Sequence, residues 1–166
     1  RFVKKQSTVQ EICLAYESFL RENPLQKIIL SVSPVRHTRD GIPENATSKA
    51  ILRVAADTLA KKFPDQVSYF PAYEIMMDEL RDYRFYASDM LHPSAQAIDY
   101  IWEKFIATSI EERLVPTLNE IDSIQKSLAH RAFNPNTANH QKFLQNLNDK
   151  IIQLQKKHPQ IQFDLQ

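Results

Sequence analysis

The near absence of glycine constrains this chain more than any other feature, because Gly41 is the single glycine among 166 residues. An average chain of this length would carry roughly a dozen. Loops that cradle phosphates or dinucleotides need several glycines close together, and the nucleophile elbow Gly-x-Ser-x-Gly needs a pair. The sequence therefore excludes these site types and predicts a fold built from helices and proline-bounded loops.

The remaining composition is typical of a folded domain, with 43% hydrophobic and 25% charged residues. A net charge of +1 gives no field that would attract nucleic acid or an anionic membrane, so neither is expected as a partner. The lone cysteine, Cys13, lies in an apolar run and is predicted to be buried. Because it leaves no internal disulfide, we expect a cytoplasmic protein. The first residue is Arg1, so we expect the native chain to begin upstream.

Hydrophobic periodicity in the first half predicts a strand–helix–strand unit preceded by a helix. The predicted elements are a helix over residues 7–22, a strand over 27–33, a helix over 46–63 and a strand over 67–70. A capping box made by Ser7 with Gln10, or by Thr8 with Glu11, would open the first helix, and Asn45 would cap the second. The unit should be parallel and right-handed. Because two strands do not make a stable open sheet, we expect further strands from upstream chain or from a partner.

The second half is predicted to be mostly helical. A short helix over residues 74–80 precedes a charged and aromatic loop, and the next helix carries Pro93 in its first turn, with His92 as its cap. Ser109 and Glu112 form a further capping-box pattern. The tail then reads as an antiparallel helical hairpin broken at residues 134–136. The fold class is thus α/β, with few parallel strands and a helical hairpin.

The sharpest chemical signal is Asp89-x-x-His92, between the predicted short helix and the helix that carries Pro93. An aspartate at this spacing can hold one imidazole nitrogen while the other faces outward as a general base. A structural alternative stays open, in which Asp89 caps a turn and His92 caps a helix.

A series of short blocks along the chain is more specific than any one of them. In order, the blocks are Ser33-Pro34-Val35-Arg36-His37, Asp40-Gly41, Glu44-Asn45, Ser48-Lys49, Tyr69-Phe70-Pro71-Ala72-Tyr73-Glu74, Asp78-Glu79-Leu80-Arg81-Asp82-Tyr83-Arg84-Phe85-Tyr86 and Asp89-Met90-Leu91-His92-Pro93-Ser94. Together they resemble the carboxyl-terminal half of the GSCFA-domain family, which is similar to the SGNH/GDSL hydrolases in fold and motif order.

The resemblance implies that residues 1–107 are the carboxyl-terminal part of a three-layer α/β/α ester hydrolase, followed by a hairpin tail over residues 108–166 that lies outside the distinctive motifs. Asp89 would orient the imidazole of His92, the general base. The family's name-giving pentapeptide, with its presumed nucleophile, and the block of oxyanion-hole donors are absent from this sequence. We therefore predict an upstream nucleophilic serine. We expect a small-molecule or glycan ester as substrate, and no cofactor.

Three further residues are predicted to contact substrate: Arg36, Arg84 and Tyr86. Arg36 would meet an anionic group or an oxyanion after the first strand. Alternatively, Arg36 and His37 belong to a solvated loop and pair with Asp40 or Glu44, which is the reading we favour for His37.

The segment that contains Arg84 and Tyr86 would form a pocket wall. The alternative for Arg84 is a clamp, in which it pairs with a nearby carboxylate and holds the loop. The candidate carboxylates for this clamp are Asp78, Asp82 and Glu74. Glu74 is either an ion-pair partner or a residue of the cleft.

Two other kinds of site have little support. Ser31, Ser33 and Ser94 lack the glycine-flanked turn that exposes a nucleophile, so they are expected to be structural. The histidines lack ligand spacing, so no metal site is expected; they are His37, His92, His130, His140 and His158.

A rival hypothesis is a non-catalytic helical interaction module. Its support is the missing nucleophile and the helical hairpin, whose seam could pair with another chain. For either function, self-association through the missing sheet strands or the hairpin is a candidate interaction.

Overall fold

The structure is a computed structural model that describes residues 5–129 and 137–163. The chain separates into two compact units, Arg1–Phe105 and Ile106–Gln166. The first unit contains α1 (Val9–Glu22), β1 (Ile28–Leu30), α2 (Ile42–Lys62), β2 (Val67–Tyr69), α3 (Ala72–Glu74), a π-helix (Ile75–Glu79), a 3-10 turn (Tyr83–Phe85) and most of α4 (Ala95–Ser109). The second contains a 3-10 turn (Glu112–Leu114), α5 (Val115–Ala129) and α6 (Ala138–Lys157).

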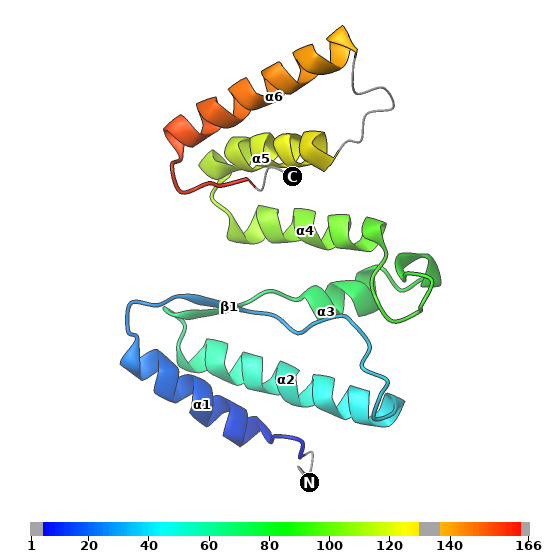
Figure 1. Cartoon of the computed structure of the whole chain (residues 1–166). Helices are drawn as coiled ribbons and strands as arrows, with labels where there is room; N and C mark the ends of the chain where they lie inside the picture. The colour runs from blue at the N-terminus through cyan, green and yellow to red at the C-terminus, as the bar shows by residue number, and fades with distance from the viewer. Residues whose placement is uncertain (1–4, 130–136, 164–166) are drawn as a thin grey trace. The chain divides into compact units, whose positions relative to one another are not determined.

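The predicted strand–helix–strand unit is confirmed. β1 and β2 pair in parallel, with Ile28 opposite Val67 and Leu30 opposite Tyr69, and α2 connects them. Within the described residues the sheet has two strands. Figure 1 shows α1 and α2 side by side on one side of these strands, with α4 on the other.

Two apolar clusters hold the first unit together. One packs α1 and α2 against the sheet through Cys13, Leu20, Ala55, Leu59 and Val67, so the predicted burial of Cys13 is confirmed. The other packs the segment after β2 against α4, and its buried members are Phe70, Ala72, Ile75, Met76, Leu80 and Ala97. The sheet is thereby fixed between helices, with its loops left at the surface.

Of the two capping boxes possible for α1, the structure contains the one made by Thr8. The Glu11 N–H donates to Thr8 Oγ1 at 3.2 Å, and the Thr8 N–H donates to Glu11 Oε2 at 2.8 Å. This box fixes the start of the helix at Val9.

The predicted start of α2 was wrong by four residues. The helix begins at Ile42, and Gly41 is its cap residue with φ +108°. Pro43 is tolerated because the first turn needs no intrahelical N–H there. Asn45, the predicted cap, instead accepts the backbone N–H of His37 at 2.8 Å.

The predicted role of His92 as the cap of α4 was also wrong. Pro93 is held in an antiparallel bridge with Tyr86, and the Ser94 N–H donates to Phe85 O at 2.7 Å. These contacts keep the chain extended until α4 begins at Ala95. Ser94 Oγ lies 3.4 Å from the Ala97 nitrogen, at the place of a cap. His92 is therefore left in the loop.

The predicted short helix over residues 74–80 is confirmed as helical but not as regular α-helix. One turn of α3 runs directly into the π-helix, where the Leu80 N–H donates to Ile75 O at 3.0 Å. Ile75 and Met76 of this wider turn are both buried in the core. Single π-turns of this kind are often found at functional sites.

The second unit is held by an apolar cluster between its two helices. Ile124 of α5 packs with Leu147, Ile151 and Leu154 of α6, which confirms the predicted apolar seam; the antiparallel orientation stays a prediction. The predicted Ser109–Glu112 box does not cap a helix: Glu111 precedes a 3-10 turn without a side-chain cap, and α5 begins at Val115, beside Pro116. The predicted break at residues 134–136 and His130 lie outside the described residues.

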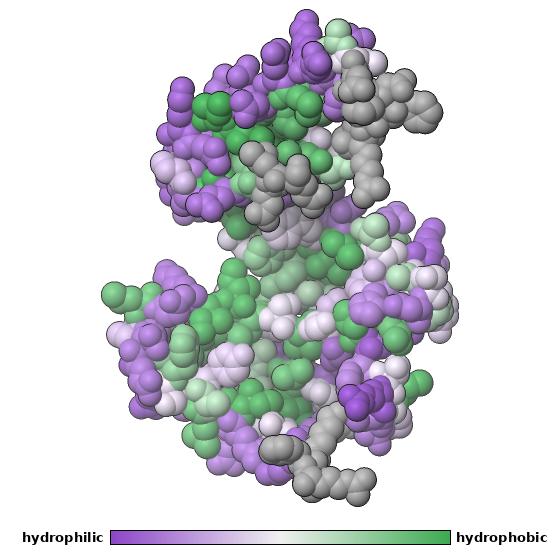
Figure 2. Space-filling view, in the orientation of Figure 1, coloured by the Kyte–Doolittle hydropathy of each residue, from purple (hydrophilic) through white to green (hydrophobic). Residues whose placement is uncertain are grey.

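Apolar residues remain at the surface of the first unit, where Figure 2 shows them in green. The large apolar side chains exposed on α1, β1 and α4 are Leu14, Tyr16, Phe19, Ile29, Ile98 and Trp102. No helix among residues 5–129 and 137–163 has the length and the hydropathy that crossing a membrane requires.

Candidate functional site

Asp89 and His92 form a hydrogen-bonded pair in the loop before α4. Asp89 Oδ2 lies 2.6 Å from Nδ1 of His92. The other carboxylate oxygen, Oδ1, accepts the backbone N–H groups of Leu91 at 2.9 Å and His92 at 3.0 Å. One carboxylate thus binds both the ring of His92 at Nδ1 and the backbone N–H of the same residue.

The charge of Asp89 determines which ring nitrogen carries the hydrogen. The backbone N–H of His92, the N–H of Leu91 and then the His92 ring lower the pKa of the Asp89 carboxyl to about 2. The carboxylate is therefore ionised near neutral pH and can only accept a hydrogen bond. Nδ1 of His92 must donate, which leaves Nε2 as the acceptor of the neutral ring.

The loop adopts an uncommon backbone conformation to make this pair. Met90, between the two residues, has φ +61°, the left-handed region that costs a non-glycine residue about 1 kcal/mol. The turn is closed by the Ala87 N–H, which donates to His92 O at 2.8 Å, and by the Met90 N–H, which donates to Ala87 O at 2.9 Å. These hydrogen bonds offset the cost of the left-handed residue.

The pair is open to solvent. The His92 side chain is 60% exposed and that of Asp89 is 45% exposed. Among the described residues, the ring of His92 has Asp89 as its hydrogen-bond partner, and no serine bonds to it. The imidazole is therefore free to meet a group brought from elsewhere.

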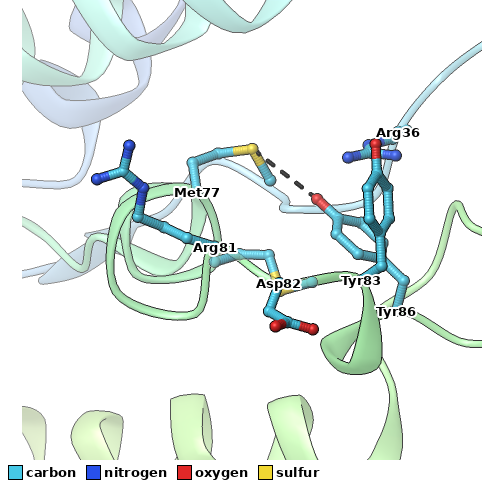
Figure 3. Close-up of a pocket in the computed structure, with 7 residues that line it drawn as sticks. Arg36, Met77, Arg81, Asp82, Tyr83 and Tyr86 are labelled. Atoms are coloured by element: carbon cyan, nitrogen blue, oxygen red, sulfur yellow. Dashed lines mark hydrogen bonds between the residues drawn. The ribbon is translucent and has the colours of Figure 1, made fainter.

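Arg36 joins the loop after β1 to the loop that carries the pair. Its backbone N–H donates to Leu91 O at 3.1 Å, and its Nη1 donates to Met90 O at 3.2 Å. Its guanidinium lies 4.1 Å from the centre of the Tyr86 ring and 6.0 Å from that of Tyr83 (Figure 3). Arg36 and Tyr86 are thus brought together beside the Asp89–His92 turn.

Arg84 and His37 lie in different surroundings. The Nε of Arg84 is 3.7 Å from Asp82 Oδ1, and 71% of its side chain is exposed, which matches the alternative of a clamp. Nε2 of His37 is 3.1 Å from Asp40 Oδ2, as in the solvated-loop interpretation. The contact of Arg84 with substrate stays a prediction.

Two cavities flank Arg36. The smaller, of about 240 Å³, lies between Arg36, Tyr83 and Tyr86 on one side and Met77 and Arg81 on the other (Figure 3). Figure 3 shows the Arg81 guanidinium directed away from Arg36, while Tyr86 reaches toward Met77, whose sulfur accepts its hydroxyl at 3.9 Å.

The larger cavity, of about 450 Å³, is lined by residues that were not predicted to belong to a site, above all Lys49 and Tyr73. It also reaches Met90 and Leu91 of the turn that holds the pair. Helical periodicity carried a signal for Lys49, because it lies seven residues before the buried Ala56 and therefore on the same face of α2.

Glu74 is an ion-pair partner, the first of its two predicted roles. Its Oε1 lies 2.6 Å from Nε of Arg53, and its Oε2 accepts the hydroxyl of Tyr69 at 2.8 Å. Arg53 also lies over the Tyr69 ring, at 4.4 Å. This trio links α2, β2 and α3 and supports the sheet below the loops.

The serines within the chain occupy structural positions. Ser33 Oγ accepts the Val35 N–H at 3.2 Å, and Ser94 supports the start of α4. Ser31 is exposed at the end of β1. In the part of the chain that the structure describes, no group of three or more His, Cys, Asp and Glu side chains could hold a metal ion.

Comparison with known protein families gives two matches. Residues 1–105 match the model described as the GSCFA family, and residues 121–166 match that described as the C-terminal domain of GSCFA domain proteins. No curated protein and no solved structure gives a significant match. The second match extends the family to residues 121–166 of the tail, whereas the placement of residues 1–107 as the carboxyl-terminal part of a larger domain stays a proposal. The first match covers more than half of the 166 residues of this chain. The chain therefore belongs to the GSCFA family.

Proposed function

We propose that this protein is an SGNH-like serine esterase that hydrolyses an ester or transfers its acyl group, with Asp89 and His92 as two members of a catalytic triad. The observation that carries the proposal is the 2.6 Å contact between Asp89 Oδ2 and His92 Nδ1, which leaves Nε2 of an exposed ring as a proton acceptor. Members of such triads are recognised by geometry and role rather than by their order in the chain.

The third member would be a serine from chain upstream of Arg1. Two features support this source. In the described residues no serine bonds to the His92 ring, and the sheet has two strands, fewer than a stable open sheet needs. Further strands paired with the edges of this sheet would complete the three-layer α/β/α arrangement and bring the serine to the loop edge where His92 lies.

The reaction would follow from the position of Nε2. As the serine oxygen attacks the ester carbonyl carbon, Nε2 of His92 takes the hydroxyl proton, and Asp89 stabilises the imidazolium that forms. When the carbon–oxygen bond to the alcohol breaks, Nε2 returns the proton to the leaving oxygen. Water then attacks the acyl-serine with His92 again as base, or an acceptor alcohol attacks and the acyl group is transferred.

The rival hypothesis of a helical interaction module is less well supported. The residues at the centre of its contact surface, Ile124, Leu147, Ile151 and Leu154, are buried against one another. The large apolar residues left exposed on α6 are Phe143, Leu144 and Ile152.

The test is turnover of a chromogenic acetate ester by the full-length protein. We expect His92→Ala to lower kcat by about 10⁴-fold or more, because both proton transfers are lost. The matched control is His37→Ala: His37 is also 60% exposed and also lies three residues from its aspartate partner. We expect this control to keep kcat within about twofold of the parent. Equal turnover by His92→Ala and the parent protein would remove His92 from the reaction.

A further inference from the structure

Lys49 of α2 is the one buried charged residue in the described part of the chain, with 8% of its surface exposed. Lysine is almost never fully buried unless it is paired. Removing an ammonium from water is costly, and an opposite charge nearby usually offsets that cost. The groups around Lys49 therefore show whether the protein itself supplies the opposite charge.

The partners of Lys49 in the described residues are neutral. Its Nζ donates to the backbone O of Ser33 at 2.5 Å and lies 5.9 Å from the centre of the Tyr73 ring. No carboxylate among these residues forms an ion pair with it. An ammonium has three hydrogens to donate, and burial alone lowers the pKa of the Lys49 amine. The charge is thus kept in a site where the protein supplies no anion.

Lys49 faces the 450 Å³ cavity together with Arg36. Aspartate and glutamate are absent from the residues that line this cavity, whereas Tyr73 and Tyr83 add hydroxyl groups and Thr38 and Asn45 add polar side chains.

The partners of Arg36 are likewise neutral, namely Met90 O and the two tyrosine rings. Among the nearby carboxylates, Asp40 is engaged by His37, and Glu44, in the first turn of α2, is not part of the lining. The cavity therefore carries two positive charges and hydrogen-bond donors, which suits an anion.

We propose that this cavity binds an anionic group, a carboxylate or a phosphate, in reach of both Lys49 and Arg36. Met90 and Leu91 line the cavity and also form the turn that holds His92, so a bound anion lies beside the candidate catalytic pair. The ester substrate accordingly carries a negative charge on the part of the molecule that enters this cavity. This last step rests on the proposed esterase function, whereas the anion site itself does not.

The anion site is tested by binding, without turnover. The isotopically labelled protein is titrated with inorganic phosphate and, separately, with succinate, at constant ionic strength, and the backbone amide signals of Thr38, Asn45 and Leu91 are followed. We expect saturable shifts with at least one anion. The anion with the lower Kd identifies the group, phosphate or carboxylate, that the cavity prefers. No saturable shift with either anion would overturn the proposal.

Variants assign the binding to the two cations. We expect Lys49→Met and Arg36→Gln each to raise the Kd about tenfold or more, the effect of losing a charged hydrogen bond. The matched control is Lys61→Met, which removes an exposed ammonium from the same helix and should change the Kd less than twofold. The amide spectrum of each variant shows whether it is folded, and Arg36→Gln tests the site independently if Lys49→Met does not fold. Equal Kd values for the control and both cavity variants would contradict the assignment.

The substrate class is tested by comparing a neutral acetate ester with a hemisuccinate ester of the same alcohol. We expect Lys49→Met to raise KM for the hemisuccinate ester about tenfold and to leave KM for the acetate ester unchanged, while His92→Ala abolishes turnover of both. Anion binding without turnover of either ester would contradict the esterase proposal but not the anion site. If the parent protein turns over both esters with the same KM, only the inference of an anionic substrate is contradicted.

Discussion

The loop after β1 and the loop before α4 each place a histidine three residues from an aspartate, and both imidazoles are 60% exposed. In the first loop, His37 meets Asp40 through Nε2 at 3.1 Å. In the second, His92 meets Asp89 through Nδ1 at 2.6 Å, and the same carboxylate accepts the N–H groups of Leu91 and His92.

The difference between the two loops shows that spacing alone does not make a catalytic pair. The backbone hydrogen bonds to Asp89 hold its carboxylate in place independently of the ring. Because this carboxylate binds Nδ1, Nε2 of His92 faces outward. His37 uses Nε2 for its own aspartate. A fixed carboxylate and an available Nε2 are what a general base needs.

The largest expected difference between the loops is in catalysis. We expect Asp89→Asn to lower kcat for ester hydrolysis by about 10⁴-fold, because an amide in this position would favour the wrong tautomer of His92. The matched change Asp40→Asn should leave kcat within about twofold of the parent protein. Measurement of kcat for both variants on one ester tests the pair, and similar losses in the two would contradict the assignment.

The next largest effect concerns the backbone of the first loop. Gly41 has φ +108°, and an added Cβ would crowd the carboxylate of Glu44. We expect Gly41→Ala to lower the free energy of unfolding by about 1–2 kcal/mol, because L-residues rarely adopt this conformation. Urea denaturation measures the change, and an unaltered midpoint would show that α2 can begin without glycine here.

The second loop should respond to glycine in the opposite direction. Met90 has φ +61°, so Met90→Gly should raise the free energy of unfolding by about 0.5–1 kcal/mol as the left-handed strain is relieved. Met90→Ala is the control, since alanine keeps the strain. A loss of stability in Met90→Gly alone would indicate that the Met90 side chain, rather than its backbone, holds the turn.

The smallest effect is a change in titration. The folded pKa of Asp89 is about 2, below its ordinary 3.8, so the stabilisation from this carboxylate is present above about pH 4 and is lost as the pH falls toward 2. We expect the amide signals of Leu91 and His92 to shift with a midpoint near pH 2, and this transition to vanish in Asp89→Asn. A midpoint near pH 4 would mean that the hydrogen bonds to the carboxylate are not kept in solution.

The parts of the fold that sequence could predict are those governed by local patterns. Thr8 with Glu11 is a capping box within one turn, and the order strand, helix, strand followed from periodicity and from Pro34 and Pro71 at the strand ends. The Asp89–His92 contact was predictable for the same reason, since both partners lie within one loop.

The parts that sequence could not predict depend on distant contacts. Arg36 donates to Met90 O, 54 residues away, and the burial of Lys49 depends on Ser33 and on the loops that close the cavity. The cap of α2 was missed because Asn45, a good cap residue by type, is taken by the backbone of His37. The positively charged cavity lined by Lys49 and Arg36 therefore could not be predicted from the sequence, because it forms only when these distant loops come together.

The central claim is that Asp89 holds the His92 ring with Nε2 facing outward. Nitrogen-15 NMR of the neutral imidazoles tests it most directly, since protonated and unprotonated ring nitrogens have well-separated shifts. We predict that His92 carries its hydrogen on Nδ1 and that His37 carries its hydrogen on Nε2, toward Asp40. A hydrogen on Nε2 of His92, or its even exchange between the two nitrogens, would contradict the claim.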